Sequence, residues 1–237
     1  MAIVQNHPPA HAPAPDTTTR RLVTVGALAG PILLLTWWWQ ALTREGYDVT
    51  RHPMSLLALG PGGAVQVASF VVTGILVLVL AVGYQRIYDR GAGSTWLPRL
   101  VASCGLGLVG AGVFRTDPGA GFPAGAPPGV PDYTTVGIAH EVSFVLVMVS
   151  WSAAMVVLLR RAHQTADRAL RDAVAVCLVL VLLVSLVPHL DSFPVRTVLA
   201  GAAQLAFLAA VPLRDCWRDR AGVTGARAPA APRGRRS

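Results

Sequence analysis

The sequence predicts an all-α integral membrane protein, a polytopic bundle of six transmembrane helices. Of its 237 residues, 53% are hydrophobic and only 14% are charged, and the mean hydropathy is +0.53. Soluble domains carry charge on about 25% of their residues, so this composition excludes an ordinary soluble protein. The apolar residues form six runs, each close to the ~20 residues that a helix needs to cross a hydrocarbon core of ~30 Å.

The six predicted spans are justified by their length and by the scarcity of charge within them. In chain order they cover residues 22–42, 64–84, 96–114, 136–159, 173–190 and 193–213. The first run has 21 residues without a charge, and Arg99 lies early enough in the third to extend its guanidinium to the interface. Small residues at helical spacing, such as Gly26 and Gly30, predict close contacts between helices in lipid.

The two ends of the chain lack such runs. Residues 1–21 are rich in Pro, and residues 215–237 are rich in Arg. Neither segment has enough apolar surface to offset the entropy cost of ordering, so we expect two disordered tails around one transmembrane domain, residues 22–214.

The arginines indicate the orientation of the bundle. All 20 basic residues are Arg, a usage typical of GC-rich bacterial genomes. Six spans place both tails and the second and fourth loops on one side, which then holds 16 Arg against 4 on the other. The positive-inside rule therefore predicts a multi-pass protein of the plasma membrane with both termini in the cytoplasm. We expect the Arg-rich C-terminal tail to contact anionic lipids of the inner leaflet, and no nucleic-acid partner, because no aromatic or fold signature accompanies the charge.

Three predicted outer loops each bring histidine together with acidic residues. Because the loop ends of a helical bundle converge, we expect one polar site at the outer membrane face. Three imidazoles with a carboxylate are typical of a catalytic divalent metal, such as zinc, that keeps one position open for water. The expected metal ligands are His52, His140 and His189.

Other residues of these loops complete the candidate site. The catalytic candidates are Asp117, Ser55 and Asp191, and a metal-free enzyme would use Asp117 or Asp191 as general acid on a lipid or isoprenoid substrate. The substrate-binding candidates are Arg51, Arg196 and Glu141. Glu141 and Arg196 lie at similar depth, one turn inside their helices, so the sequence predicts an ion pair between the fourth and sixth spans.

Three interpretations of this polar cluster remain open. It is an enzyme site, with or without a metal; or it only joins helix ends; or the protein is a small transporter, receptor or scaffold. The metal spacing is not diagnostic, since no HxxH or HExxH occurs and the adjacent His140 and Glu141 point to different helix faces. Transporters usually show inverted repeats and polar midplane residues, and neither is visible in the sequence.

The loops themselves carry local predictions. Ser55 is expected to cap a short interfacial helix that Gly60 and Pro61 terminate. The Pro-rich segment 115–133 is expected to form a semi-rigid flap over the mouth of the bundle.

Two motifs resemble a known family. The segment 47–63 contains Arg-His-Pro-x-Ser at 51–55 and is followed by Gln66 and by Phe70 to Gly74, while residues 112–118 read Gly-Val-Phe-Arg-Thr-Asp-Pro. With His140 at the start of the next span, this pattern resembles the bacterial and archaeal membrane family called domain of unknown function 998, over residues 22–213. The resemblance implies six helices and marks Arg51, His52, Ser55, Asp117 and His140 as motif residues, without an activity.

Overall fold

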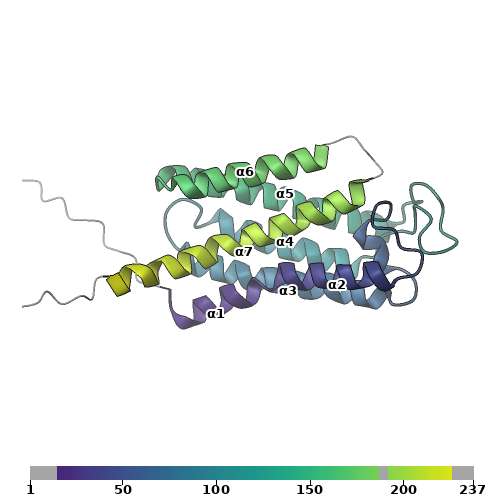
Figure 1. The fold of residues 1–237 in the computed structure, drawn as a ribbon, viewed down its shortest axis with the longest axis horizontal. Coiled ribbons are helices and arrows are strands. Elements are labelled where there is room, and N and C mark those ends of the chain that lie inside the picture. Colours follow the sequence, from purple (N-terminus) through teal and green to yellow (C-terminus); the bar gives the residue numbers. More distant parts are fainter. Residues whose placement is uncertain (1–14, 187–191, 226–237) are drawn as a thin grey trace, which may run out of the picture.

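The computed structural model describes residues 15–186 and 192–225, and all regular structure in them is helical (Figure 1). The fold class predicted from composition is thus confirmed as all-α for these residues. The helices are α1 (Thr17–Gly26), α2 (Ala29–Thr43), α3 (Gly63–Ile87), α4 (Trp96–Val113), α5 (Thr135–Gln164), α6 (Arg168–Leu186) and α7 (Phe193–Gly225), with a short 3-10 helix η1 (Met54–Ala58).

Five segments of the described chain are long and apolar enough to cross a membrane. They are Thr17–Thr43, Gly63–Ile87, Trp96–Val113, Thr135–Gln164 and Phe193–Trp217. The chain is therefore compatible with an integral membrane protein. Helix α6 is not among the five, so the sixth span and the orientation of the termini stay predictions.

The first span is two helices, where the sequence analysis predicted one. The chain is helical up to Gly26, makes a turn at Ala27 and Leu28, and becomes helical again at Ala29. Pro31 accounts for the break, because it has no backbone N–H and its ring collides with the carbonyl four residues earlier, that of Ala27. Together α1 and α2 still supply one membrane-length segment.

Glycines permit the closest helix contacts. A Cβ on Gly74 in α3 would lie 2.6 Å from the carbonyl oxygen of Gly105 in α4, and a Cβ on Gly105 would lie 2.8 Å from that of Gly74. Gly107 approaches Ser143 of α5 in the same way. Helices α3, α4 and α5 consequently form a tightly packed layer, as small residues allow in lipid.

The remaining helices close this layer into a ring. Helix α6 packs on α5, and α7 packs on α6. Helices α1 and α2 pack on α3, and α7 contacts all three of them. The pair α5 and α7 is not among the packed pairs. Residues 44–62 and 114–134 lie together at one end of this ring, the right-hand end in Figure 1, which we call the loop end.

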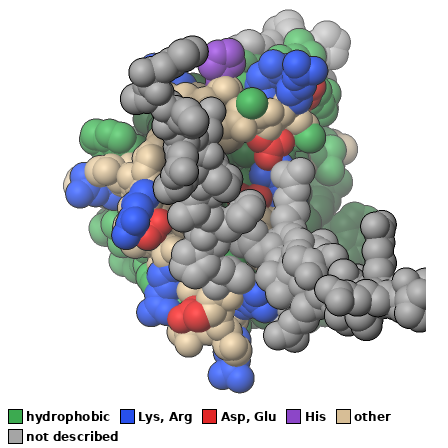
Figure 2. Space-filling view, turned by 90° about the vertical axis from the view of Figure 1, so that its left-hand side faces the viewer, with side chains coloured by type: hydrophobic (Ala, Val, Ile, Leu, Met, Phe, Trp, Pro, Cys, Tyr) green, Lys and Arg blue, Asp and Glu red, His purple; other side chains and the backbone are tan. Residues whose placement is uncertain are grey.

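The opposite end is held by an aromatic and ionic network. The Tyr88 hydroxyl donates to the Asp215 carboxylate (2.7 Å), the Arg161 guanidinium lies 4.4 Å from the Tyr88 ring centroid, and Arg214 pairs with Asp167 (3.0 Å). Figure 2 shows this end, with Arg side chains around its rim beside a few carboxylates. The network ties α3 and α5 to α7 at the end where the sequence places most of the Arg.

Labelling of introduced cysteines tests the predicted topology. Ala124, in the loop end, and Thr165, at the opposite end, are both exposed, and each is replaced singly by Cys after the native Cys104, Cys177 and Cys216 have been changed to Ala. We expect an impermeant thiol reagent to label position 124 on intact cells and position 165 only after permeabilisation. Equal labelling of the two positions on intact cells contradicts the topology.

Candidate functional site

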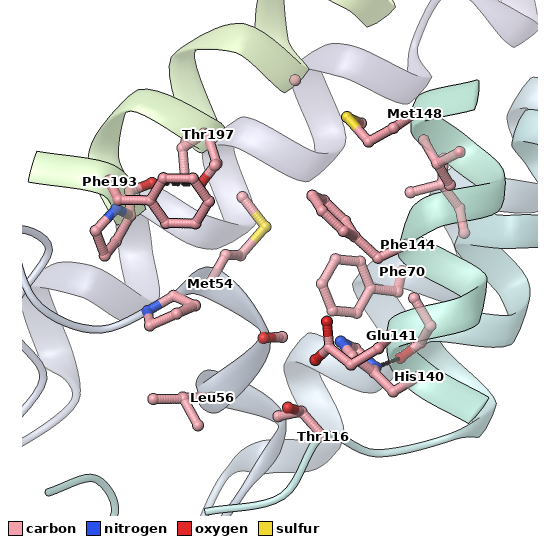
Figure 3. A pocket seen from close by; sticks show the side chains of 18 of the residues that line it. Met54, Leu56, Phe70, Thr116, His140, Glu141, Phe144, Met148, Phe193 and Thr197 are labelled. Atoms are coloured by element: carbon pink, nitrogen blue, oxygen red, sulfur yellow. Dashed lines mark hydrogen bonds between the residues drawn. The ribbon is translucent and has the colours of Figure 1, made fainter. Parts of the chain in front are cut away.

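A cavity of about 720 Å³ extends from the loop end into the middle of the ring (Figure 3). Ligand pockets commonly measure about 300 to 1,000 Å³, so it is large enough for a sizeable ligand. Its lining comes from α2, η1, α3, α4, the loop 114–134, α5 and α7. The polar side chains gather at the loop end, whereas the deep end is lined by Trp151, Leu205 and Leu208.

Helix α5 provides a continuous stripe along this cavity. His140, Phe144, Val147 and Trp151 all line it, at the spacing that places residues on one helix face. At 1.5 Å per residue the stripe is about 16 Å long. Glu141 also lines the cavity although it lies about 100° around the helix from His140, so the two reach one space from different faces.

The cavity brings together five of the residues chosen from the sequence. They are Arg51, Ser55, Asp117, His140 and Glu141. His52 and Arg196 are described but are not among the lining residues. His189 and Asp191 lie outside the described residues, so their part in the site stays a prediction.

His140 is buried, 4% exposed, and its orientation is set by the end of α4. Its Nδ1 lies 3.0 Å from the carbonyl oxygen of Ala111 and 2.8 Å from that of Phe114. Because carbonyl oxygens only accept hydrogen bonds, Nδ1 carries the proton and donates to both. The neutral ring therefore has its lone pair on Nε2, which forms no hydrogen bond with any described residue and is available to a ligand.

Asp117 is a cap for α5. Its carboxylate accepts hydrogen bonds from the backbone N–H of Thr134 (2.7 Å) and from the Thr134 hydroxyl (2.8 Å), and that hydroxyl in turn accepts from the N–H of Gly137 (3.1 Å). A negative charge is also favourable at the positive end of the helix dipole. Both carboxylate oxygens thus hold α5 in place, and a general-acid role for Asp117 would require this cap to open.

His52 links the first and third loops. Its Nδ1 accepts from the Asp48 N–H (2.8 Å), its Nε2 donates to the Ala120 carbonyl (3.1 Å), and its ring lies 5.6 Å from Tyr47 and 5.3 Å from Phe122. Burial raises the pKa of the Tyr47 hydroxyl, while hydrogen bonds from Thr50 lower the pKa of the Asp48 carboxyl. Both nitrogens of His52 are engaged, so binding a metal there would break the contact between the loops.

The described residues contain no group of three or more His, Cys, Asp or Glu side chains placed to hold a metal ion. The three-histidine metal site predicted from the sequence includes His189, which the structure does not describe. It therefore remains a prediction without geometric support.

The predicted ion pair between Glu141 and Arg196 is wrong. Arg196 donates from Nη1 to the carbonyl oxygen of Val184 (2.9 Å), toward α6, because α7 packs more extensively on α6 than on α5. Glu141 forms no hydrogen bond or ion pair with any described residue. The half-buried carboxylate is left at the edge of the cavity.

The two predictions made for the loops, the helix capped by Ser55 and the Pro-rich flap, have different outcomes. The short helix of the first loop exists as η1, but Pro53 occupies its N-cap position and Ser55 lies inside it, so the Ser55 cap is wrong. The Pro-rich loop does cover the loop end, where Thr116, Gly119 and Ala120 line the cavity.

The sequence analysis missed the α7 side of the cavity. Gly201 and Gln204 line it, and a Cβ added to Gly201 would meet nothing within 4 Å. The α5 stripe was detectable, since His140, Phe144 and Trp151 have helical spacing. On α7 the signal was weaker, because most of its lining residues are small or apolar like those that face lipid, although Thr197 and Gln204 are polar and lie at helical spacing with Gly201.

Comparison with known proteins identifies the family. The model for the family described as "Protein of unknown function (DUF998)" matches residues 27–214, and the chain belongs to this family. No curated protein and no solved structure matches the chain.

Substitution of Gly137 tests the Asp117 cap. Alanine normally stabilises a helix relative to glycine by about 1 kcal/mol. A Cβ at Gly137 would, however, overlap the Asp117 carboxylate, so we expect Gly137→Ala to lower the melting temperature in detergent. Asp117→Ala alone should cost about 0.5–2 kcal/mol, as loss of a cap does. In the Asp117→Ala background the penalty of Gly137→Ala should disappear.

Gly201→Ala is the matched control, because it adds the same methyl group to open space. It should leave the melting temperature unchanged or raise it. If Gly137→Ala is as well tolerated as Gly201→Ala, the cap does not constrain α5.

Proposed function

We propose that this member of the family is an integral membrane protein that binds a lipid of the outer leaflet in the α5/α7 cavity and acts on its head group by acid–base chemistry through His140. The observation that carries the proposal is the distribution of polarity along the cavity, whose polar side chains gather mainly at the loop end and whose deeper part is mostly apolar, with Gln204 as an exception. The α5 stripe measures about 16 Å, close to half of a ~30 Å hydrocarbon core. A lipid molecule in one leaflet likewise has a polar head group above apolar acyl chains, over a similar depth.

A depression on the side of α5 supports entry of the lipid from the bilayer. A shallow second depression on this helix is lined by Tyr133, Ile138, Glu141, Val142 and Val145. Four of these five residues are exposed, and Glu141 lines both this depression and the cavity. Contact between α5 and α7 is sparse and includes a hydrogen bond from Gln204 to the Met148 sulfur (3.7 Å), so a lipid can pass beside Glu141 without separating a closely packed helix pair.

The chemistry assigned to His140 follows from its tautomer. With Nδ1–H held by two carbonyl oxygens, Nε2 accepts the proton of a hydroxyl group, that of water or of Ser55, as its oxygen attacks an ester bond of the head group. The same proton then passes to the leaving oxygen. Asp117 contributes by fixing the first turn of α5, and so the position of His140.

Among the described residues, the available histidine nitrogens favour a metal-free reaction. His140 offers one free ring nitrogen, while both nitrogens of His52 serve the loops. The proposal therefore rests on acid–base chemistry and includes no metal.

Filling the cavity tests lipid binding. Gly201→Phe places a ring in open space inside the cavity, and Ala203→Phe places the same ring on the exposed side of α7. With a photoactivatable phospholipid in detergent, we expect Gly201→Phe to abolish crosslinking to cavity residues and Ala203→Phe to retain it. Undiminished crosslinking in Gly201→Phe contradicts binding in the cavity.

His140→Asn separates the chemistry from binding. The asparagine amide nitrogen takes the place of Nδ1 and can donate to the same carbonyls, but nothing replaces Nε2. We expect normal lipid crosslinking and at least a hundredfold slower conversion of phospholipids in nanodiscs, measured by mass spectrometry, as for loss of a general base. Conversion at the wild-type rate would exclude His140 as the base.

A further inference from the structure

We infer that the lipid bound in this cavity is zwitterionic, a phospholipid whose phosphate lies at Arg51 and whose ammonium group lies at Glu141. This inference rests on the proposed lipid binding and adds the class of head group. It follows from which charges at the loop end already have partners within the protein and which do not.

Two charged groups at the loop end are used by the fold. Arg44 donates from Nη1 to the Leu57 carbonyl (3.3 Å) and from Nη2 to the Leu59 carbonyl (2.6 Å). The Asp117 carboxylate is engaged by Thr134. These two charges hold loops and helix ends, so they are not available to a ligand.

Glu141 is the cavity-lining carboxylate that no described residue engages. It is half-buried, lines the cavity, and has neither a hydrogen bond nor an ion pair with a residue of the described chain. A carboxylate partly removed from water without a partner is costly, and more so at membrane depth. A ligand cation would offset that cost.

The surroundings of Glu141 also favour a cation. In Figure 3 the rings of Phe70 and Phe144 lie on the same side of the cavity as the Glu141 carboxylate. Aromatic faces carry partial negative charge and attract ammonium groups. Helix α5 thus offers both a carboxylate and an aromatic side chain to a positive group.

Arg51 is the unused positive charge. It precedes η1 and lines the same cavity, and it makes no hydrogen bond or ion pair with any described residue. The neighbouring Asp48 carboxylate accepts hydrogen bonds from the N–H (2.8 Å) and the hydroxyl (2.7 Å) of Thr50, and the exposed Arg51 interacts with it only through the attraction of opposite charges. Guanidinium groups bind phosphate through paired N–H donors, so Arg51 is suited to the phosphate of a head group.

The two charges together define the head group. Figure 3 shows η1, with Met54 and Leu56, on one side of the cavity and α5, with Glu141, on the other. A lipid with a single negative charge would satisfy Arg51 and leave Glu141 unpaired. A head group that carries both a phosphate and an amine satisfies both residues at once.

Competition between lipids tests this inference on the full-length protein. The photoactivatable phospholipid is displaced by phosphatidylethanolamine, phosphatidylcholine or phosphatidylglycerol of identical acyl chains. In the wild type we expect the two zwitterionic lipids to compete about tenfold better than phosphatidylglycerol, as a charge-assisted contact provides. Glu141→Gln should remove this preference by weakening only the zwitterionic lipids, whereas Arg51→Gln should weaken all three lipids.

Each outcome separates the inference from the proposed function. Crosslinking that is blocked by Gly201→Phe but competed equally by all three lipids in the wild type overturns the zwitterionic head group and leaves lipid binding intact. If Glu141→Gln weakens competition by all three lipids equally, the inference is overturned as well, because the carboxylate then stabilises the protein without contacting the head group. Crosslinking insensitive to Gly201→Phe overturns lipid binding itself.

Discussion

The loop end of this protein depends on two reciprocal hydrogen-bonded links between α4 and α5. His140, in α5, donates to the carbonyl oxygens of Ala111 and Phe114 at the end of α4. Asp117, just beyond α4, accepts from Thr134 at the start of α5. Each helix end thus provides hydrogen-bond partners for polar groups of the other helix end. In a membrane these groups have no water to bind instead. The loop 114–134 starts and finishes at these links, which hold it over the cavity.

The same links determine which groups remain for a ligand. Two acceptors on Nδ1 leave the lone pair of His140 on Nε2, and the close contact of Gly107 with Ser143 keeps α5 against α4. Helix α5 is thereby held on the α4 side of the ring, while α7 follows α6. The cavity lies between α5 and α7, and its lining includes residues such as Trp151 and Leu208 that are also buried in the core.

The helical class, the family and most helix positions could be predicted from the sequence, because membrane-length apolar runs are a strong signal. The break of the first span was detectable at Pro31, although length alone favoured one helix. Of the residues expected to form one site, Arg51, Ser55, Asp117, His140 and Glu141 line one cavity, whereas His52 and Arg196 do not. The predicted pairing of Glu141 with Arg196 failed, because similar depth in the bilayer does not determine which neighbour a helix face meets, and Arg196 contacts α6.

Residue type alone could not separate the structural from the available polar groups. His52 and His140 are both buried and both belong to the family-like motifs, yet His52 uses two ring nitrogens for the loops and His140 uses one. Arg44 and Arg51 lie in one loop, but only Arg44 binds backbone carbonyls of the described chain. A carboxylate partly removed from water without a partner is costly, so a fold that retains the half-buried Glu141 in this state loses stability, whereas the exposed Arg51 remains in contact with water. A ligand cation at Glu141 would offset that loss, which makes the unpartnered carboxylate a better guide to what the cavity binds than the motif residues taken as a group.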